Sequence, residues 1–216
     1  MDFWDRLDAV ADRWNVLRHP FYLRWSEGTM TRPELAFYAG QYAYAVEALA
    51  AATSDLARRS PSTGNERHAA EEEAHVSLWA GFQEAVGSSG AEPLPETADC
   101  ARAWADPDRS ELRTLVSLYA IESAQPAISE TKRTGLVERY GFEPGPATRY
   151  FDVHAVLDVE HARVARGAIA EAREPATSPD RDGEDDALVA EAERVLSANW
   201  RLLDGVDRVS AERARR

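Results

Sequence analysis

One stretch, Tyr150-Phe-Asp-Val-His-Ala-Val-Leu-Asp-Val-Glu-His-Ala-Arg, constrains the fold of this chain more than any other. Within it, His154, Asp158 and His161 follow the spacing H-x3-D-x2-H. Residues three, four and seven apart share one face of an α-helix, so these three side chains point the same way. Two imidazoles and a carboxylate on one stripe form half of a metal site, with the ligand types that non-haem iron prefers. The stretch therefore predicts a helix inside a metal-binding bundle.

An exposed helix that carries a polar stripe is the alternative interpretation of the same spacing. Two observations weigh against it. The chain has five histidines, and two of them fall in this stretch. Apolar Phe151, Leu157 and Val164 also stand beside the polar stripe, as expected for a helix with a buried face. We therefore favour the metal site.

Apolar residues recur at helical spacing along most of the chain, and no segment shows the sustained alternation of a strand. Pro126 lies inside one expected helix and predicts a kink there. The sequence predicts an all-α single domain over 1–216 with about seven helices, four of them long. An exposed loop is expected over 173–185 and a disordered tail over 209–216. The expected helices cover about 3–18, 21–28, 32–59, 65–86, 110–140, 147–172 and 186–208, with a short one around 96–104.

The composition excludes several classes of function. The net charge of −13 argues against a nucleic-acid partner and against an anionic membrane surface. Cys100 is the only cysteine, so an intrachain disulfide is impossible and a reducing, cytoplasmic setting is expected. The first residues lack the basic start and apolar run of a signal peptide, and no run of about 18 apolar residues is present.

Further ligands are expected from the helix over 65–86. Glu72 precedes His75 by three residues, and Glu-x2-His is the spacing that carboxylate-bridged di-iron bundles use. Glu71 and His68, four and seven residues before His75, share its face and stand in reserve. A solvated face is the alternative for these acids, and for Glu73 it is the better interpretation.

Two other helices each contribute one acid among apolar neighbours. Glu122 lies in Leu-Tyr-Ala-Ile-Glu-Ser-Ala, next to Pro126, and Glu47 lies in Tyr-Ala-Val-Glu-Ala-Leu. Burying an unpaired carboxylate is costly, so a buried acid normally has a partner or a metal. Glu122 is therefore a predicted ligand, while Glu47 is balanced between a ligand and a structural acid.

These residues together resemble the haem-oxygenase-like di-metal oxidases and oxygenases, whose wider superfamily includes thiaminase II and the pyrroloquinoline quinone synthase. The resemblance spans nearly the whole chain, and H-x3-D-x2-H is its most specific part, because it separates metal-binding members from metal-free ones. The other matching stretches are His19-Pro-Phe-Tyr-Leu-Arg-Trp, Tyr38-Ala-Gly-Gln-Tyr, His75-Val-Ser-Leu-Trp-Ala-Gly-Phe and Glu122-x3-Pro-x5-Lys132.

The resemblance implies a haem-oxygenase-like fold without haem, which binds two Fe(II) ions and uses O2 as co-substrate. His75, Glu122, His154, Asp158 and His161 carry over as ligands, Asp158 or Glu122 would bridge the metals, and Glu72 or Glu47 would supply the extra carboxylate. Imidazole and carboxylate also accept manganese in one position. The implied partners are a small amine, amino-acid or fatty-acid substrate, an electron donor and a second copy of the chain.

One branch resembles this sequence more closely, that of the chlamydial death-domain-associated protein. It makes p-aminobenzoate at its own expense, with a tyrosine as the source of the ring and a lysine as the source of the amine. The matching residues here are Tyr22, Tyr150 and Lys132. The sequence departs from that branch at Ile121, where the chlamydial protein has a tyrosine, and in a shorter spacing before His75.

Three functions therefore compete. In a general di-iron oxygenase, aromatic residues such as Tyr38, Tyr42 and Trp79 would line a pocket for an external substrate. A thiaminase-II-like hydrolase would need an activated cysteine, and Cys100 lies outside the long helices. A non-enzymatic regulatory protein would suit the acidic surface, but it would leave acids of buried character beside histidines unexplained. We expect the di-iron oxygenase, with the self-sacrificing synthase as its alternative.

Overall fold

The computed structural model describes residues 1–173 and 181–215, which are almost entirely helical. Within these residues there is no strand. No helix in this part of the chain is long and apolar enough to cross a membrane. The elements are α1 (Phe3–Arg13), a 3-10 helix η1 (Val16–Arg18), α2 (Pro20–Glu27), α3 (Arg32–Arg59), α4 (Thr63–Val86), α5 (Pro95–Trp104), α6 (Glu111–Glu122), α7 (Gln125–Glu138), α8 (Arg149–Arg173) and α9 (Arg181–Ala214).

Local sequence signals set the helix ends. Thr31 and Glu34 form a capping box at the start of α3, where each side chain accepts a hydrogen bond from the backbone N–H of the other. Gly28 and Gly87 end α2 and α4 with φ angles of 72° and 74°, in the left-handed conformation that glycine adopts without a steric cost.

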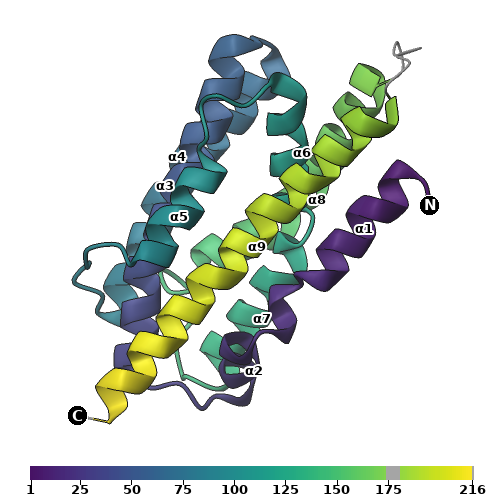
Figure 1. Ribbon diagram of the computed structural model, residues 1–216. Coiled ribbons are helices and arrows are strands. Elements are labelled where there is room, and N and C mark those ends of the chain that lie inside the picture. Colours follow the sequence, from purple (N-terminus) through teal and green to yellow (C-terminus); the bar gives the residue numbers. More distant parts are fainter. Residues whose placement is uncertain (174–180, 216) are drawn as a thin grey trace.

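The helices pack as a bundle in which α9 runs along the whole length of the molecule. Figure 1 shows α3, α4 and α5 on one side of α9 and α1 on the other. Helix α3 packs along α4, while α6 and α7 both pack against α8. Three helices that are far apart in sequence, α4, α6 and α8, therefore meet in one part of the interior.

The helix expected over 110–140 is broken rather than kinked. Helix α6 ends at Glu122, and α7 begins at Gln125 with Pro126 in its first turn. Proline lacks the N–H that would bond to the carbonyl four residues earlier, which here belongs to Glu122. The chain therefore restarts as a new helix, where the missing donor costs nothing.

Helix α9 differs most from the sequence prediction. The residues expected to form a disordered tail are helical as far as Ala214, and the Arg213 guanidinium lies 4.0 Å from the centre of the Phe37 ring. Of the loop expected over 173–185, residues 181–185 belong to α9, while 174–180 lie outside the described residues.

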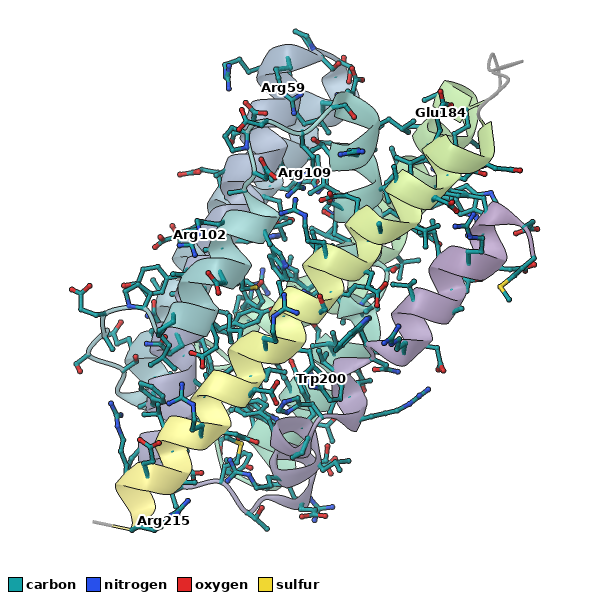
Figure 2. All side chains as sticks on the ribbon, in the orientation of Figure 1. Arg59, Arg102, Arg109, Glu184, Trp200 and Arg215 are labelled. Atoms are coloured by element: carbon teal, nitrogen blue, oxygen red, sulfur yellow. The ribbon has the colours of Figure 1, made fainter. Side chains whose placement is uncertain are left out.

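Side chains fill the space between the helices (Figure 2). Arg109, labelled there, lies between α5 and α9, with its Nε 3.2 Å from an oxygen of Glu191, and both side chains are buried. A buried guanidinium needs such a partner, because an unpaired buried charge is strongly destabilising.

Gly135 on α7 gives a stability prediction. A Cβ at this position would lie 2.5 Å from Nε1 of Trp25, which donates a hydrogen bond to the carbonyl of Lys132. We expect Gly135→Ala to lower the free energy of unfolding by ~1–3 kcal/mol, the usual cost of overpacking. Gly167 on α8 is exposed, and a Cβ there would meet no atom within 4 Å. Gly167→Ala should therefore raise stability by up to ~1 kcal/mol. Urea denaturation measures both, and an unchanged Gly135→Ala variant would contradict the close packing.

Candidate metal centre

Six of the predicted ligands converge in the interior where α4, α6 and α8 meet. Each is at most 7% exposed, although all six are ionisable. Helix α4 supplies Glu72 and His75, the last residue of α6 supplies Glu122, and α8 supplies His154, Asp158 and His161. Together with His68, which is described below, these residues are called the cluster.

Many polar atoms of the cluster make no hydrogen bond. The described part of the chain has thirteen buried side-chain nitrogen and oxygen atoms without a hydrogen bond, and eight of them belong to the cluster. Buried polar groups are rarely left unpaired, so a concentration of this kind needs an explanation. Bound cations would give these atoms the partners that they lack. The eight atoms are Nε2 of His68 and His154, Nδ1 of His161, Oε2 of Glu72 and both carboxylate oxygens of Glu122 and Asp158.

The donor atoms fall into two groups that share one residue. His68, Glu72, Glu122 and His161 each place a ligand atom within 4.8 Å of the others, and Glu72, His75 and His154 do the same. Glu72 is common to both groups, so it is placed to bridge two ions, a role that the sequence suggested for Asp158 or Glu122. Imidazole and carboxylate donors suit iron and manganese.

Hydrogen bonds outside the cluster orient two of its histidines. Nδ1 of His154 lies 2.8 Å from the carbonyl oxygen of Tyr150, so Nδ1 carries the proton and Nε2 keeps its lone pair. Nε2 of His161 lies 2.8 Å from Oε2 of Glu71, which leaves Nδ1 of His161 facing the cluster. Partners of this kind fix the tautomer and the ring orientation of metal-binding histidines.

His68 and Glu71, the two residues held in reserve as ligands, both contact predicted ligands of the cluster. His68 Nε2 lies 2.8 Å from Glu122 Oε1, although this contact does not meet the angular requirement of a hydrogen bond. Glu71 orients His161 from outside the cluster. The signal for His68 was present in the sequence, because it lies four residues before Glu72 and seven before His75, on the same helical face.

Glu47 is not brought to the cluster, so its prediction as a ligand is corrected. Its side chain is exposed, and it lines a groove on the outer surface with Asp99 and Arg102. Its neighbours Val46 and Ala48 are buried, but successive helical residues are about 100° apart, so two buried neighbours leave the residue between them pointing outward.

The titration of the cluster reflects its burial and its charges. Burial raises the pKa of Asp158 and lowers the pKa of His154. Burial also lowers the pKa of His161, but Asp158, Glu122 and Glu71 outweigh it and raise the pKa to about 9. In the metal-free protein His161 is therefore protonated at neutral pH. A metal ion would replace that positive charge and release the proton.

A second group of buried polar residues lies beside the cluster. Lys132, 1% exposed, hydrogen-bonds through Nζ to the Tyr38 hydroxyl, and five aromatic rings surround that nitrogen. Nζ is 5.5 Å from the centre of the Tyr22 ring and 4.5 Å from that of Tyr42. We call Tyr22, Tyr38, Tyr42 and Lys132 the tyrosine–lysine group. Lys132 is also the only lysine among 25 lysine and arginine residues. This singularity is visible in the sequence and would have supported the functional role that the resemblance gave to Lys132.

Burial disfavours the charged form of the Lys132 amine. It lowers the pKa of Lys132 well below the ordinary value of 10.5, and burial also raises the pKa of Tyr22. Burial therefore favours the uncharged, nucleophilic form of the Lys132 amine and the protonated form of the Tyr22 phenol.

A stability prediction follows from Lys132. At pH values between its folded pKa and 10.5, the unfolded chain holds a proton on this lysine that the folded chain lacks, so stability rises with pH. We expect Lys132→Met to be more stable than the wild type at pH 7, with a Tm at least ~2 °C higher. The gain should shrink as the pH approaches 10.5. Thermal unfolding across the range from neutral to alkaline pH measures this, and a difference that does not vary with pH would mean that the amine is charged in the fold.

Aromatic rings connect the two groups. Tyr150 stacks on His154 with ring centres 3.9 Å apart, and its ring centre is 4.8 Å from that of Trp79, which is 5.1 Å from that of Tyr42. Trp79 and Tyr42 are at most 2% exposed. The aromatic residues expected to line a substrate pocket therefore pack against one another and around Lys132.

Cys100 has none of the properties of a catalytic nucleophile. Its side chain is fully buried on α5, and burial raises the pKa of the thiol well above its usual range. The thiolate is the reactive form, so a thiaminase-type reaction finds no nucleophile here.

Comparison with known proteins agrees with this geometry. The profile of a family described as iron-containing redox enzymes matches residues 64–200. A 4-aminobenzoate synthase of Nitrosomonas europaea is 30% identical over 228 residues, covering 94% of this chain and 90% of that protein. Another, from Chlamydia muridarum, is 31% identical over 185 residues and 78% of each chain.

Solved structures share the fold at low sequence identity. A domain with a heme oxygenase-like fold from Shewanella denitrificans OS217 aligns with a TM-score of 0.74 at 19% identity, covering 96% of this chain and 93% of that one. A TenA homologue from Pseudomonas syringae pv. tomato aligns with a TM-score of 0.78 at 16% identity, covering 95% and 91%. The expected haem-oxygenase-like fold is thereby confirmed.

Proposed function

Because this chain belongs to the family of iron-containing redox enzymes, we propose that it is a 4-aminobenzoate synthase that consumes its own side chains. Tyr22 supplies the ring, Lys132 supplies the nitrogen, and O2 accepts the electrons. The single observation that carries this proposal is the position of the only lysine, which is buried with its Nζ 5.5 Å from the centre of the Tyr22 ring. The names of the relatives support the same product.

The cluster would hold two Fe(II) ions, with Glu72 between them. His68, Glu122 and His161 surround one position, while His75 and His154 face the other. Both oxygens of Asp158 are buried and make no hydrogen bond, and Oδ1 lies 3.4 Å from Nδ1 of His161, so Asp158 would complete one of the two sites. When bound, such a metal pair supplies the oxidising chemistry with O2, and the protein supplies the ligand geometry.

The bonds that change follow from comparing a tyrosine side chain with 4-aminobenzoate. Both have a benzene ring with two groups in para positions. The Cα–Cβ bond of Tyr22 must break, and Cβ must be oxidised to the carboxyl carbon. The amine nitrogen must replace the phenol oxygen, which leaves as water, while the Nζ–Cε bond of Lys132 breaks and Cε is oxidised to an aldehyde, with O2 as the electron acceptor. Because the side chain of Tyr22 and the nitrogen of Lys132 are both consumed, each protein molecule makes the product once.

The small volume of the cavity beside the cluster favours a substrate that is part of the protein. The cavity that reaches it has a volume of about 50 Å³ and is lined by His68, His161, Leu118 and Ala165 among others. Sites for small organic molecules usually measure ~300–1,000 Å³. The cavity would therefore admit O2 but not an amino acid.

Isotope labelling tests the proposal directly. The protein is produced with ring-¹³C tyrosine and ¹⁵N-Nζ lysine, loaded with Fe(II) without air, and then exposed to O2. We expect 4-aminobenzoate that carries both labels, no more than a single molecule per chain, with loss of mass at residues 22 and 132. Because the chain has one lysine, the ¹⁵N label reports on that residue alone.

Unlabelled tyrosine and lysine in the reaction buffer serve as the control. Product without label would show that the substrates are external, and it would favour a conventional oxygenase at the same cluster. Product with a labelled ring and unlabelled nitrogen would show that the protein supplies the ring, as proposed for Tyr22. It would also show that a free amine, and not Lys132, supplies the nitrogen.

A further inference from the structure

A second cavity lies on the side of α6 that faces away from the cluster. It has a volume of about 360 Å³ and opens between the end of α1, η1, the α6–α7 junction and α9. Figure 1 shows α1 beside α9 at this part of the bundle. The volume falls in the range of sites for small organic molecules. None of the cluster residues or the tyrosine–lysine group lines it.

The walls of this cavity are apolar and aromatic. The lining residues include Trp14 and Val16, Ile121 and Ile128, and Trp104, which is 2% exposed. Walls of this composition favour an aromatic or other apolar molecule, because its transfer from water is favourable.

One polar group in the cavity has no partner within the described residues. Asn199 on α9 lines the cavity and is 6% exposed, and its Oδ1 makes no hydrogen bond. A buried carbonyl oxygen without a donor costs ~1–3 kcal/mol. An occupant with an N–H or O–H group would remove that cost, which sets the polar chemistry of the ligand.

The charge at the cavity selects the ligand further. Asp8 and Asp12 are exposed on α1 and are the only charged residues among the described ones that line it, so no lysine or arginine stands there to bind an anion. Asp12 pairs with Arg18, while Asp8 forms no ion pair with any residue that the structure describes. An anionic ligand would be repelled, and a neutral or cationic one would be accepted.

We propose that this cavity binds a small neutral or cationic aromatic molecule whose amine or hydroxyl group donates a hydrogen bond to Oδ1 of Asn199. The proposal goes beyond the synthase activity and does not depend on it. The occupant would contact Ile121 and Ser123, the two residues on either side of Glu122. The site is therefore adjacent in sequence to the cluster, yet separate from it in space.

Three probe molecules of similar size test the proposal by isothermal titration calorimetry with the whole protein. We expect 4-methylaniline to bind. Toluene, which lacks the donor, should bind about fivefold more weakly, as for the loss of one hydrogen bond. 4-Aminobenzoate, in which a carboxylate replaces the methyl group, should bind at least ~10-fold more weakly because of the negative charge.

Variants test whether 4-methylaniline binds in this cavity. Asn199→Leu should bind 4-methylaniline no better than toluene. Ala124→Phe fills the cavity and should abolish binding, while Ala85→Phe, an exposed position on α4, should leave it unchanged. If circular dichroism shows that Ala124→Phe is unfolded, Ala127→Leu at the cavity wall replaces it. Equal binding of 4-aminobenzoate and 4-methylaniline, or unchanged binding in the filled variant, would overturn the proposal.

Discussion

Tyr22→Phe should make no detectable 4-aminobenzoate, a loss of at least ~100-fold, while it binds as much iron as the wild type. The phenol oxygen is the group that the amine nitrogen must replace, and phenylalanine has none. Tyr22 is no part of the cluster, so its loss leaves every candidate ligand in place. Liquid chromatography with mass spectrometry measures the product, and a colorimetric iron assay measures the metal content.

Tyr44→Phe is the matched control for this variant. Tyr44 lies on α3, outside the tyrosine–lysine group, and its hydroxyl donates a hydrogen bond to the carbonyl of Ala91 at 2.9 Å. This substitution also removes a single tyrosine hydroxyl, and product formation should persist. If Tyr22→Phe still makes the product, another tyrosine is the source of the ring. Tyr38 would be the first candidate, since its hydroxyl contacts Nζ of Lys132.

The convergence of six candidate ligands could be predicted because helical geometry is local. His154, Asp158 and His161 lie on one face through their spacing alone, and so do Glu72 and His75. Glu122 stood out because an acid among apolar residues needs a partner when it is buried. These inferences require only that each segment is helical, and the structure brings all six side chains together. Whether they bind metal stays a prediction.

Features that depend on packing between helices could not be predicted in the same way. Glu47 and Glu122 both have apolar neighbours, but only the orientation of α3 in the bundle shows that Glu47 faces solvent. The surroundings of Lys132 are a tertiary property too, because the rings around its amine come from α2, α3, α4 and α8. The sequence matched Tyr22 with Lys132 by resemblance, and their proximity is a result of the fold.

Glu72→Gln should lose nearly all iron, from about two ions per chain, the number in di-iron carboxylate bundles, to below ~0.5. Glu72 is the one residue shared by both groups of donor atoms, so its loss affects both positions, whereas His75→Ala should affect one. Glu73→Gln is the matched control, because the neighbouring acid is exposed and should leave the iron content unchanged. Iron determination after anaerobic loading and desalting measures all three variants.

A structural role for Glu72 would give a different thermal signature. Contacts with His75, His154 and His68 outweigh burial and lower the pKa of Glu72, so it is ionised in the metal-free protein and its substitution lowers the Tm before iron is added. A ligand that binds only the folded state raises the Tm, and the rise grows with the logarithm of the ligand concentration relative to its Kd. Fe(II) should therefore raise the Tm of the wild type and of Glu73→Gln, but not that of Glu72→Gln. If iron still stabilises Glu72→Gln to the same extent, the shared carboxylate does not bridge the metals. Asp158, neither of whose oxygens makes a hydrogen bond, then becomes the bridging candidate.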